Sequence, residues 1–550
     1  MGKKRLCYLV FFSSFLFFPL FLEAADEIAL RFLILSGKEE RGLASRSIPD
    51  EEGVYFEDLD VPGERHVLVE RLGILLRCPI SEELIEEIGG IVKEFYQDSY
   101  RPLVSVFVPD QEISEGTLRL VVEESIVACI SYEGNQWFSS EQLAGEIRQE
   151  VGFPFCADLV RRDLLWLNRT PFRETILLLS PGEEEGTCSL SFFSEDGRPY
   201  RLFLGADNAG FAATGKDRLF FGVHLGNLFH ADHQLFYRYT TTTRFGRFIA
   251  HTGQYSAPLP WRHLLTFYGG YSSIRAIDLA EGITQKGTAW QTSMRYLIPL
   301  DPVGGYDHQL QWGIDYKNTD INLVFDAVPI LGDRAILTQL AVGYELQWAK
   351  YATHWSLETQ IFASPGDLFA HQSDEDFASL RPGADSSYVY LRAEGSALTS
   401  IPGGWQWVNR SSWQIASANL LSSEQYGLGG LDTVRGYDER IVNTDDAWFF
   451  STEIRTPATR LFVWAKEKKE RDTLQWLVFF DYGVGANVKR VLAKEKKYLY
   501  LTGIGLGLRY RYRHHAQLRF DMGWPLHRQI APNITQQSGA QLHVSSQITF

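Results

Sequence analysis

From Tyr200 to its end, the chain is a succession of short segments in which apolar and polar residues alternate, separated by turn residues. The clearest segment is 503–513, whose even positions hold Ile, Leu and Tyr and whose odd positions hold Gly and Arg. Successive side chains of a β-strand point to opposite faces, so one face of this strand is apolar and the other is small and then cationic. A soluble β-sandwich could not use the second face as a core. The pattern therefore favours a strand with lipid on one side and a polar lumen on the other.

The alternating segments are numerous enough to close a barrel. They lie at about residues 200, 217, 232, 247, 263, 289, 307, 337, 353, 387, 405, 448, 474, 500, 514 and 540. We therefore predict a sixteen-stranded antiparallel transmembrane β-barrel over residues 199–550, because an even number of strands lets the two ends of the sheet pair and leaves no backbone unpaired in lipid. The last segment ends in Phe550, with Ile548 and Leu542 on the same face, which resembles the terminal signal of bacterial outer-membrane proteins.

A different pattern precedes the barrel, from Asp26 to about Gly197. Its first half predicts a strand at 28–35, a loop or linker at 37–63, two helices, and strands at 103–108 and 117–122. The second of these helices begins after Ser81, a suitable N-cap. The same order then repeats as a strand at 126–132, helices at 140–151 and 157–168, and strands at 174–180 and 186–193. We predict two α+β modules, 26–123 and 124–198. Each is too small to be a catalytic domain, and two copies of one small module favour a region that binds another protein.

The N-terminus and the net charge restrict the cellular compartment of the chain and the class of partner that it can bind. Residues 1–25 run from Lys3-Lys4-Arg5 through an apolar stretch to Ala24-Ala25, which is the order of a secretory signal peptide; a retained N-terminal anchor is the alternative. No later stretch reaches the roughly 18 apolar residues of a membrane helix, so the mature chain can enter a membrane only with strands. A net charge of -15 argues against a nucleic-acid partner.

Metal chemistry is not favoured. After cleavage four cysteines remain, and none has metal-ligand spacing: Cys78, Cys129, Cys156 and Cys188. An oxidising compartment permits disulfides, so disulfides and buried free thiols are both open. The histidine pairs at 230/233 and 514/515 lack a third ligand at a fitting distance along the chain. We expect no metal and no cofactor.

Short motifs mark the turns of both predicted modules. In the first they are Tyr100-Arg101-Pro102, the segment from Val106 through Pro109 to Gln111, and Gly116-Thr117-Leu118. In the second they are Leu167-Asn168, Pro171-Phe172 and Ser180-Pro181-Gly182. Together these motifs resemble the polypeptide-transport-associated (POTRA) modules of two-partner secretion transporters. The resemblance implies that both modules lie in the periplasm and receive a transported protein.

The segment 417–447, between the strands predicted near 405 and 448, is about thirty residues long and exceeds an ordinary connection. It is glycine-rich and contains Val434-Arg435-Gly436-Tyr437. This tetrapeptide resembles the loop-tip motif shared by the TpsB-type transporters of the ShlB/FhaC/HecB family and the BamA-type insertases. The resemblance implies that the loop folds back into the lumen and that its arginine contacts the barrel wall. An ordinary surface loop is the alternative.

An arginine inside the lumen needs an acidic partner. In the strand at 474–482, Trp476 and Val478 share a face with Phe480 and would point to lipid, so Asp481 points inward. Phe480-Asp481-Tyr482-Gly483 is similar to the family's second barrel motif, whose acid receives the loop arginine. We therefore predict a pair between Arg435 and Asp481.

Other charges are also expected in the lumen. Glu453 and Arg455 share an inward face and predict a second charge cluster, with generic lumen charges as the alternative. Arg509 and Arg511 lie on the cationic face of the strand at 503–513. These charges give the predicted lumen a polar wall.

These features predict an outer-membrane transporter that recognises an unfolded, exported TpsA-type partner in the periplasm and secretes it through its barrel. Outer-membrane lipid and the assembly machinery for barrel proteins are the other expected partners. The alternative is an assembly factor of the BamA type, although such factors resemble chains with more modules. The chain contains neither a G-x-S-x-G nucleophile motif nor a G-x-x-x-x-G-K-[ST] phosphate loop, so we predict that it is not an enzyme.

Overall fold

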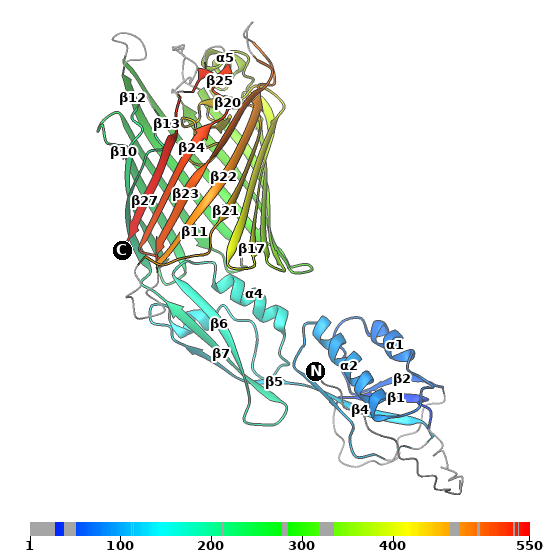
Figure 1. Ribbon diagram of the computed structural model, residues 1–550. Coiled ribbons are helices and arrows are strands. Elements are labelled where there is room, and N and C mark those ends of the chain that lie inside the picture. The colour runs from blue at the N-terminus through cyan, green and yellow to red at the C-terminus, as the bar shows by residue number, and fades with distance from the viewer. Residues whose placement is uncertain are drawn as a thin grey trace, which may run out of the picture. The chain divides into compact units, whose positions relative to one another are not determined.

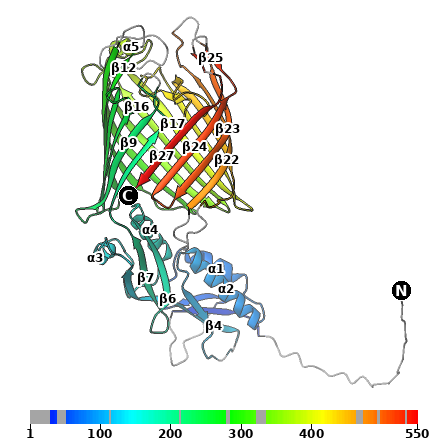
Figure 2. The ribbon, with the colours of Figure 1, turned by 60° about the vertical axis from the view of Figure 1, so that its left-hand side comes forward.

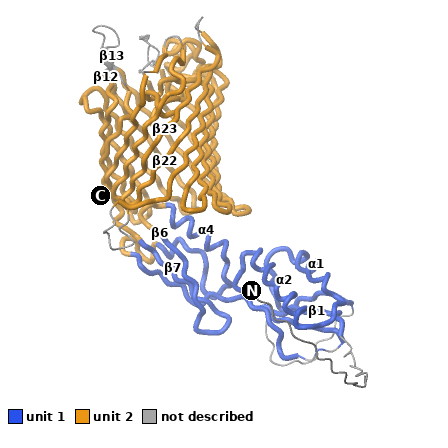
Figure 3. Tube along the Cα trace, in the orientation of Figure 1, with its two compact units in different colours: residues 1–135, 143–169, 174–195 blue, residues 136–142, 170–173, 196–550 orange. Residues whose placement is uncertain are grey.

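The structure is a computed structural model that describes residues 28–37, 51–111, 113, 115–211, 214–277, 284–319, 335–461, 472–491, 496–531, 534–536 and 538–550. The predicted signal peptide, 1–25, lies outside the described residues. The chain forms two compact units (Figure 3): residues 1–135, 143–169 and 174–195 belong to one, and residues 136–142, 170–173 and 196–550 to the other. None of the helices in the described part of the chain is long and apolar enough to span a membrane.

The first module is a four-stranded sheet with two helices. In the order β2-β1-β4-β3, its strands are β2 (Gly53–Glu57), β1 (Phe32–Ser36), β4 (Thr117–Glu124) and β3 (Val104–Phe107), and its helices are α1 (Arg65–Gly73) and α2 (Glu82–Asp98). Ser81 caps α2 as predicted, since its hydroxyl accepts a hydrogen bond from the Leu84 amide at 3.2 Å. The prediction of a loop or linker over 37–63 is wrong at residues 53–57. β2 lies there and pairs in parallel with β1, because Val54 and Phe56 pack against the core of the module.

The second module is a three-stranded sheet with two helices. Its elements are β5 (Ile126–Glu133), α3 (Ser140–Ala144), α4 (Ala157–Leu167), β6 (Arg173–Pro181) and β7 (Thr187–Asp196), with the sheet order β5-β7-β6. The helix predicted over 140–151 ends early, at Ala144. Side chains beyond it capture the backbone that would continue the helix: Asp163 accepts from the Arg148 amide at 2.8 Å, and the Gln149 side chain bonds Pro154 and Cys156.

The barrel confirms the predicted count of sixteen antiparallel strands. The strands are β8 (Tyr200–Asp207), β9 (Arg218–Leu228), β10 (His233–Thr242), β11 (Phe248–Pro258), β12 (Leu264–Ile277), β13 (Thr284–Pro299), β14 (Tyr306–Thr319), β15 (Ala335–Lys350), β16 (Thr353–Pro365), β17 (Ser387–Ile401), β18 (Trp405–Ala416), β21 (Asp446–Arg455), β22 (Asp472–Ala486), β23 (Leu499–Tyr512), β24 (Ala516–Pro525) and β27 (Gln541–Thr549). β27 pairs with β8 and closes the sheet, where the red end of the chain meets the green strands in Figure 2.

The two faces of the barrel strands differ as the alternation predicts. In β22, Trp476 and Val478 are 58% and 51% exposed on the outer face, whereas Leu477 and Phe479 are buried on the inner face. An apolar outer face is the surface that lipid covers. The inner face is therefore available for polar side chains and for the loop.

Small elements gather at one end of the barrel, opposite the C-terminus (Figure 1). They are α5 (Asp374–Leu380), the paired strands β19 (Tyr426–Leu428) and β20 (Val442–Thr444), and the paired strands β25 (Gln529–Ala531) and β26 (Ile534–Thr535). β19 and β20 belong to loop 417–447, which is a folded hairpin. The C-terminal Phe550 bonds the Leu202 backbone near the start of β8, so that end is the one at which the chain enters the barrel.

Candidate functional site: the buried tip of loop 417–447

Arg435 is the largest fully buried side chain among the described residues, and it lies at the tip of loop 417–447. Its Nε donates to one oxygen of Asp481 at 2.7 Å and its Nη2 donates to the other at 2.8 Å. The Arg435 backbone amide also donates to Asp481, at 3.0 Å. A two-pronged guanidinium–carboxylate contact sets direction as well as attraction, so β22 fixes the orientation of the loop tip.

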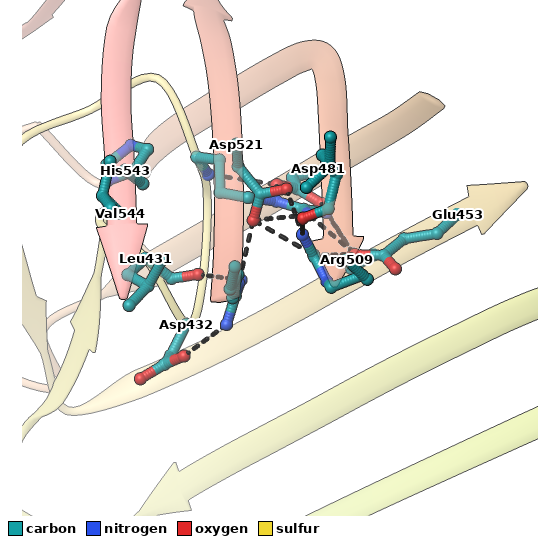
Figure 4. Close-up of polar contacts among 12 residues, drawn as sticks. Leu431, Asp432, Glu453, Asp481, Arg509, Asp521, His543 and Val544 are labelled. Carbon is teal, nitrogen blue, oxygen red and sulfur yellow. Dashed lines mark hydrogen bonds and ion pairs between the residues drawn. The ribbon is translucent and has the colours of Figure 1, made fainter. Parts of the chain in front are cut away.

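Four further inner-wall groups contact the same guanidinium, one of which is the Ser451 hydroxyl, which accepts from Nη2 at 3.2 Å. Its Nη1 donates to Glu453 of β21 at 2.6 Å and lies 3.5 Å from a carboxylate oxygen of Asp521 of β24. The Arg435 guanidinium carbon lies 3.5 Å from the ring centre of Phe479, a cation–π distance. Figure 4 shows Asp481, Asp521 and Glu453 converging from separate strands. Arg435 thus joins three strands of the barrel wall to the loop.

The carboxylates around Arg435 bind other arginines in turn. Arg455 donates to Glu453 at 2.7 Å, Arg509 donates to Asp521 at 2.7 Å, and Arg519 reaches Asp521 at 2.8 Å and Asp432 at 2.9 Å. Among the described residues, these ion pairs link four arginines with four carboxylates, so the cluster is balanced in charge. The two residues predicted as a second inward cluster, Glu453 and Arg455, are part of the Arg435 cluster.

The backbone of the loop tip fits closely against β24. Gly436 has φ +96°, a conformation that favours glycine, and an added Cβ would lie 3.0 Å from backbone atoms of residues 523–525. Its amide donates to Nε2 of His543 at 3.1 Å. A Cβ on Gly503 would overlap the carbonyl oxygen of Arg435. The tip is therefore held by its main chain as well as by its charge.

The flanking motif residues hold the tip in place. Val434 is buried and packs against Gly483, whose Cβ, if present, would lie 2.8 Å from a Val434 methyl group. The Tyr437 hydroxyl donates to the carbonyl of His527 at 2.7 Å and accepts from the Thr502 amide at 3.2 Å. All four residues of the tetrapeptide are thus buried and in contact with the barrel.

Of the other residues predicted for the barrel wall, some belong to the Arg435 cluster and some do not. Phe480 lies on the outer face and is 39% exposed, so it is next to the anchor in sequence but outside the lumen. Arg509 belongs to the cluster, whereas Arg511 is exposed further along β23 and adds no hydrogen bond or ion pair to it within the described residues. The groups at the site that were not predicted as site residues include Ser451, Asp521 and Phe479, and also Arg519, Asp432 and His543. Ser451, Asp521 and Phe479 lie on inward faces of the barrel strands, so alternation places them in the lumen but does not show that they contact Arg435.

The motif residues of the modules close turns. The Gln111 side chain donates to the Arg119 carbonyl at 2.7 Å and accepts from the Arg119 amide at 2.9 Å, and Asn168 makes the same double contact with Thr175. The remaining ones also lie at turns: the Gly116 carbonyl accepts from the Arg31 amide, Pro109 follows β3, Pro181 ends β6 and Gly182 follows it. These residues stabilise the modules and expose no reactive group.

The described residues contain no group of three or more His, Cys, Asp and Glu side chains that could hold a metal ion. The four cysteines in the modules are free thiols.

Two α+β modules of POTRA-like form and a closed sixteen-stranded barrel whose lumen holds a buried loop, together with a family match over residues 186–510, define an outer-membrane transporter with modules in the periplasm. Residues 186–510 match the haemolysin secretion/activation protein family ShlB/FhaC/HecB, and the chain belongs to this family. It is a two-partner secretion transporter that exports a partner protein, and it is not an enzyme.

Relatives and solved structures agree with this assignment. The heme/hemopexin transporter protein HuxB of Haemophilus influenzae (strain 86-028NP) is 21% identical over 443 residues, which cover 77% of this chain and 74% of HuxB. The outer membrane transporter CdiB of Dickeya dadantii (strain 3937) is 21% identical over 433 residues, 74% of this chain and 72% of that protein. The structure of CdiB from Escherichia coli shares the fold, with a TM-score of 0.76 at 15% identity over 96% of this chain and 92% of that one.

Proposed function

We propose that the chain receives its partner unfolded in the periplasm and passes it outward through the barrel lumen, past loop 417–447. The observation that carries the proposal is the fully buried guanidinium of Arg435, which is satisfied by Asp481 and Glu453 of the inner wall. A charge buried in this way costs several kcal/mol to leave unpaired, on the order of 3–5. The loop is therefore held firmly in the space through which a transported chain must pass, and its position controls export.

We propose that the second module binds the partner by strand addition. β6 is an edge strand of nine residues, and its Ile176 and Leu178 are 47% and 49% exposed on one face. Long apolar edges invite pairing with another chain, and most soluble proteins block them with charges or prolines. An extended apolar segment of the partner would hydrogen-bond the unpaired backbone groups of β6 and cover its exposed apolar side chains.

A lysine at the edge tests this recognition. We expect Leu178→Lys to reduce the partner at the cell surface several-fold, because an inserted charge blocks strand pairing. Leu165→Lys is the matched control, since Leu165 is 46% exposed on α4 of the same module. A cross-linking group at position 178 should capture a stalled partner. Equal secretion by both variants, or cross-links confined to barrel loops, would contradict strand addition.

The remaining predictions on targeting and partners form part of the same proposal. Residues 1–25 act as a cleaved signal peptide, the modules occupy 26–123 and 124–198, and the barrel occupies 199–550. The apolar outer face of the barrel contacts outer-membrane lipid, and the assembly machinery recognises the last strand, whose Phe550 is 65% exposed. N-terminal sequencing of the mature protein tests the cleavage site.

Deletion of the gene tests export directly. We expect one specific protein to disappear from the cell surface while the other outer-membrane barrel proteins keep their normal amounts. A general loss of barrel proteins would instead identify an assembly factor and overturn the proposal.

A further inference from the structure

Loop 417–447 has a second buried charge, Glu424, at its base. The Glu424 side chain is 2% exposed and accepts from the Lys317 ammonium with both carboxylate oxygens, at 2.9 and 3.0 Å. It also accepts from the Tyr390 hydroxyl at 2.8 Å and from Gln339 at 3.3 Å. These partners come from β14, β17 and β15, which are not the strands that hold Arg435.

The wall that receives Glu424 is itself an ordered polar layer. Asp315 of β14 pairs with Arg295 at 2.7 Å and accepts from Gln339 at 2.9 Å, and Gln339 accepts from the Tyr388 hydroxyl at 3.1 Å. Asp315 is buried and satisfied by Arg295 and Gln339, which leaves Lys317 of the same strand to pair with Glu424. Among the described residues, the Lys317 ammonium donates two hydrogen bonds, and Glu424 accepts both.

Beside this contact lies the neck of the loop, where the two arms that contain Glu424 and Asp445 leave the barrel wall and are joined to each other. The Gln414 side-chain amide donates to the Glu424 carbonyl and to the Asp445 carbonyl, both at 3.0 Å. Glu424 lies on the arm that leaves β18 and Asp445 on the arm that enters β21. One amide group thus ties the two arms together where they leave the wall.

The two buried contacts lie on different arcs of the barrel wall. Glu424 is held by β14, β15 and β17, on the β18 side of the loop, and Arg435 by β21, β22 and β24, on the β21 side. The partners that lie farthest apart, Lys317 on β14 and Asp521 on β24, are separated by eight of the sixteen strand-to-strand steps around the barrel. Loop 417–447 is therefore held on both sides of the two strands from which it extends.

We propose that Glu424 and Lys317 form a second anchor, and that loop 417–447 closes the lumen only while both this contact and the Arg435 contact are made. This inference rests on the proposed function, in which the position of the loop controls export. Glu424 and Lys317 are positioning residues. Loss of their contact frees the base, and the loop then turns about its Arg435 tip and opens a path along β14 to β17.

Charge exchange tests the anchor in the purified full chain, reconstituted in planar lipid bilayers. Lys317→Glu and Glu424→Lys each place like charges together, and we expect either to raise the open population of the pore about tenfold. The double variant restores an ion pair and should return to wild-type conductance. Lys350→Glu is the matched control, a charge reversal at an exposed lysine of β15 outside the lumen contacts. Heat-modifiable gel mobility checks folding. If a charge-reversal variant fails to fold, the neutral variant at the same position, Lys317→Gln or Glu424→Gln, takes its place in the conductance measurement.

The outcomes separate this proposal from the function on which it rests. Single variants with wild-type conductance, or a double variant no closer to wild type than its parents, would overturn the second anchor. If Arg435→Ala opened the pore in that case, the loop would still control the pore, but without a second anchor at Glu424 and Lys317. If the single variants opened the pore but neither they nor Arg435→Ala changed secretion of the partner, the anchor would stand and the control of export by the loop would fail.

Discussion

The tip and the base of loop 417–447 are held by opposite chemistry. At the tip the loop brings a cation, Arg435, to a wall of carboxylates, whereas at the base it brings a carboxylate, Glu424, to a wall that offers Lys317 and Tyr390. Exchanging the two ends would place like charges together on both walls. The loop can therefore dock in only one direction.

The two ends also differ in how tightly the main chain is enclosed. The tip packs its backbone against Gly503 and Gly523 of the wall, while the base is held mainly through side chains. Buried ion pairs add little net stability, because desolvation offsets their attraction, but breaking one side is costly. The tip should therefore tolerate change least, and the base should be the end that releases first.

The largest effect is expected from Arg435→Ala. It leaves Asp481 and Glu453 buried without their shared partner, at a cost of about 3–5 kcal/mol, and should nearly abolish secretion. Arg435→Lys keeps the charge but loses the two-pronged contact, so it should secrete at an intermediate level. The measurement is partner protein in the medium, normalised to barrel in the membrane. Arg511→Ala, an exposed arginine of β23, is the control, and wild-type secretion by Arg435→Ala would show that the tip is dispensable.

A smaller effect is expected from Gly503→Ala, which tests the backbone fit of the tip alone. The added methyl group would overlap the Arg435 carbonyl, so the loop must shift, at a cost of about 1–3 kcal/mol. Gly253→Ala on β11 is the matched control, because its Cβ would lie 3.8 Å from the nearest backbone oxygen. Urea-dependent loss of heat-modifiable mobility measures both. Equal midpoints for the two variants would mean that charge alone holds the tip.

Alternation along the sequence predicted the barrel and several charges of its inner wall, since a period of two both counts the strands and assigns Asp481, Glu453 and Arg509 to the lumen. It could not choose among the other inward charges. Asp521 meets Arg435 because of the stagger between β22, β23 and β24, and this stagger depends on the whole closed sheet. Glu424 was not predicted because it lies in a loop, where side-chain direction has no period to reveal it.

In the modules the missed features have local causes. β2 is only five residues long and stands between segments rich in turn-forming and acidic residues, so its apolar positions gave a weak signal. α3 ends early because Asp163, a residue of the next helix, accepts a hydrogen bond from the Arg148 amide, which would otherwise continue the helix. Contacts of this kind become visible only when the partner element is in place.

A moderate effect is expected from Arg381→Ala, which weakens the base from the end of the barrel that carries α5. Arg381 bonds both carboxylate oxygens of Asp445, at 2.5 and 3.0 Å, and the Leu420 carbonyl, so it connects the neck of the loop to the segment after α5. Removing this partly buried contact should cost about 1–3 kcal/mol and make the base more accessible to protease, with the tip still bound. Cleavage near 417–425 after brief proteolysis is the measurement. Cleavage first at the tip would contradict the order of release.

The smallest effect is expected from Lys489→Ala, at the same end of the barrel. Lys489 pairs with Asp385 at 2.5 Å, but its side chain is 56% exposed, and exposed pairs contribute about 0–1 kcal/mol. Its backbone amide still donates to Asn419, so the support of the loop base is preserved. Proteolysis and secretion should match wild type at physiological salt. If Lys489→Ala released the base as readily as Arg381→Ala, surface charge would matter as much as the buried contacts, and the tip and the base would not differ in the way that their burial implies.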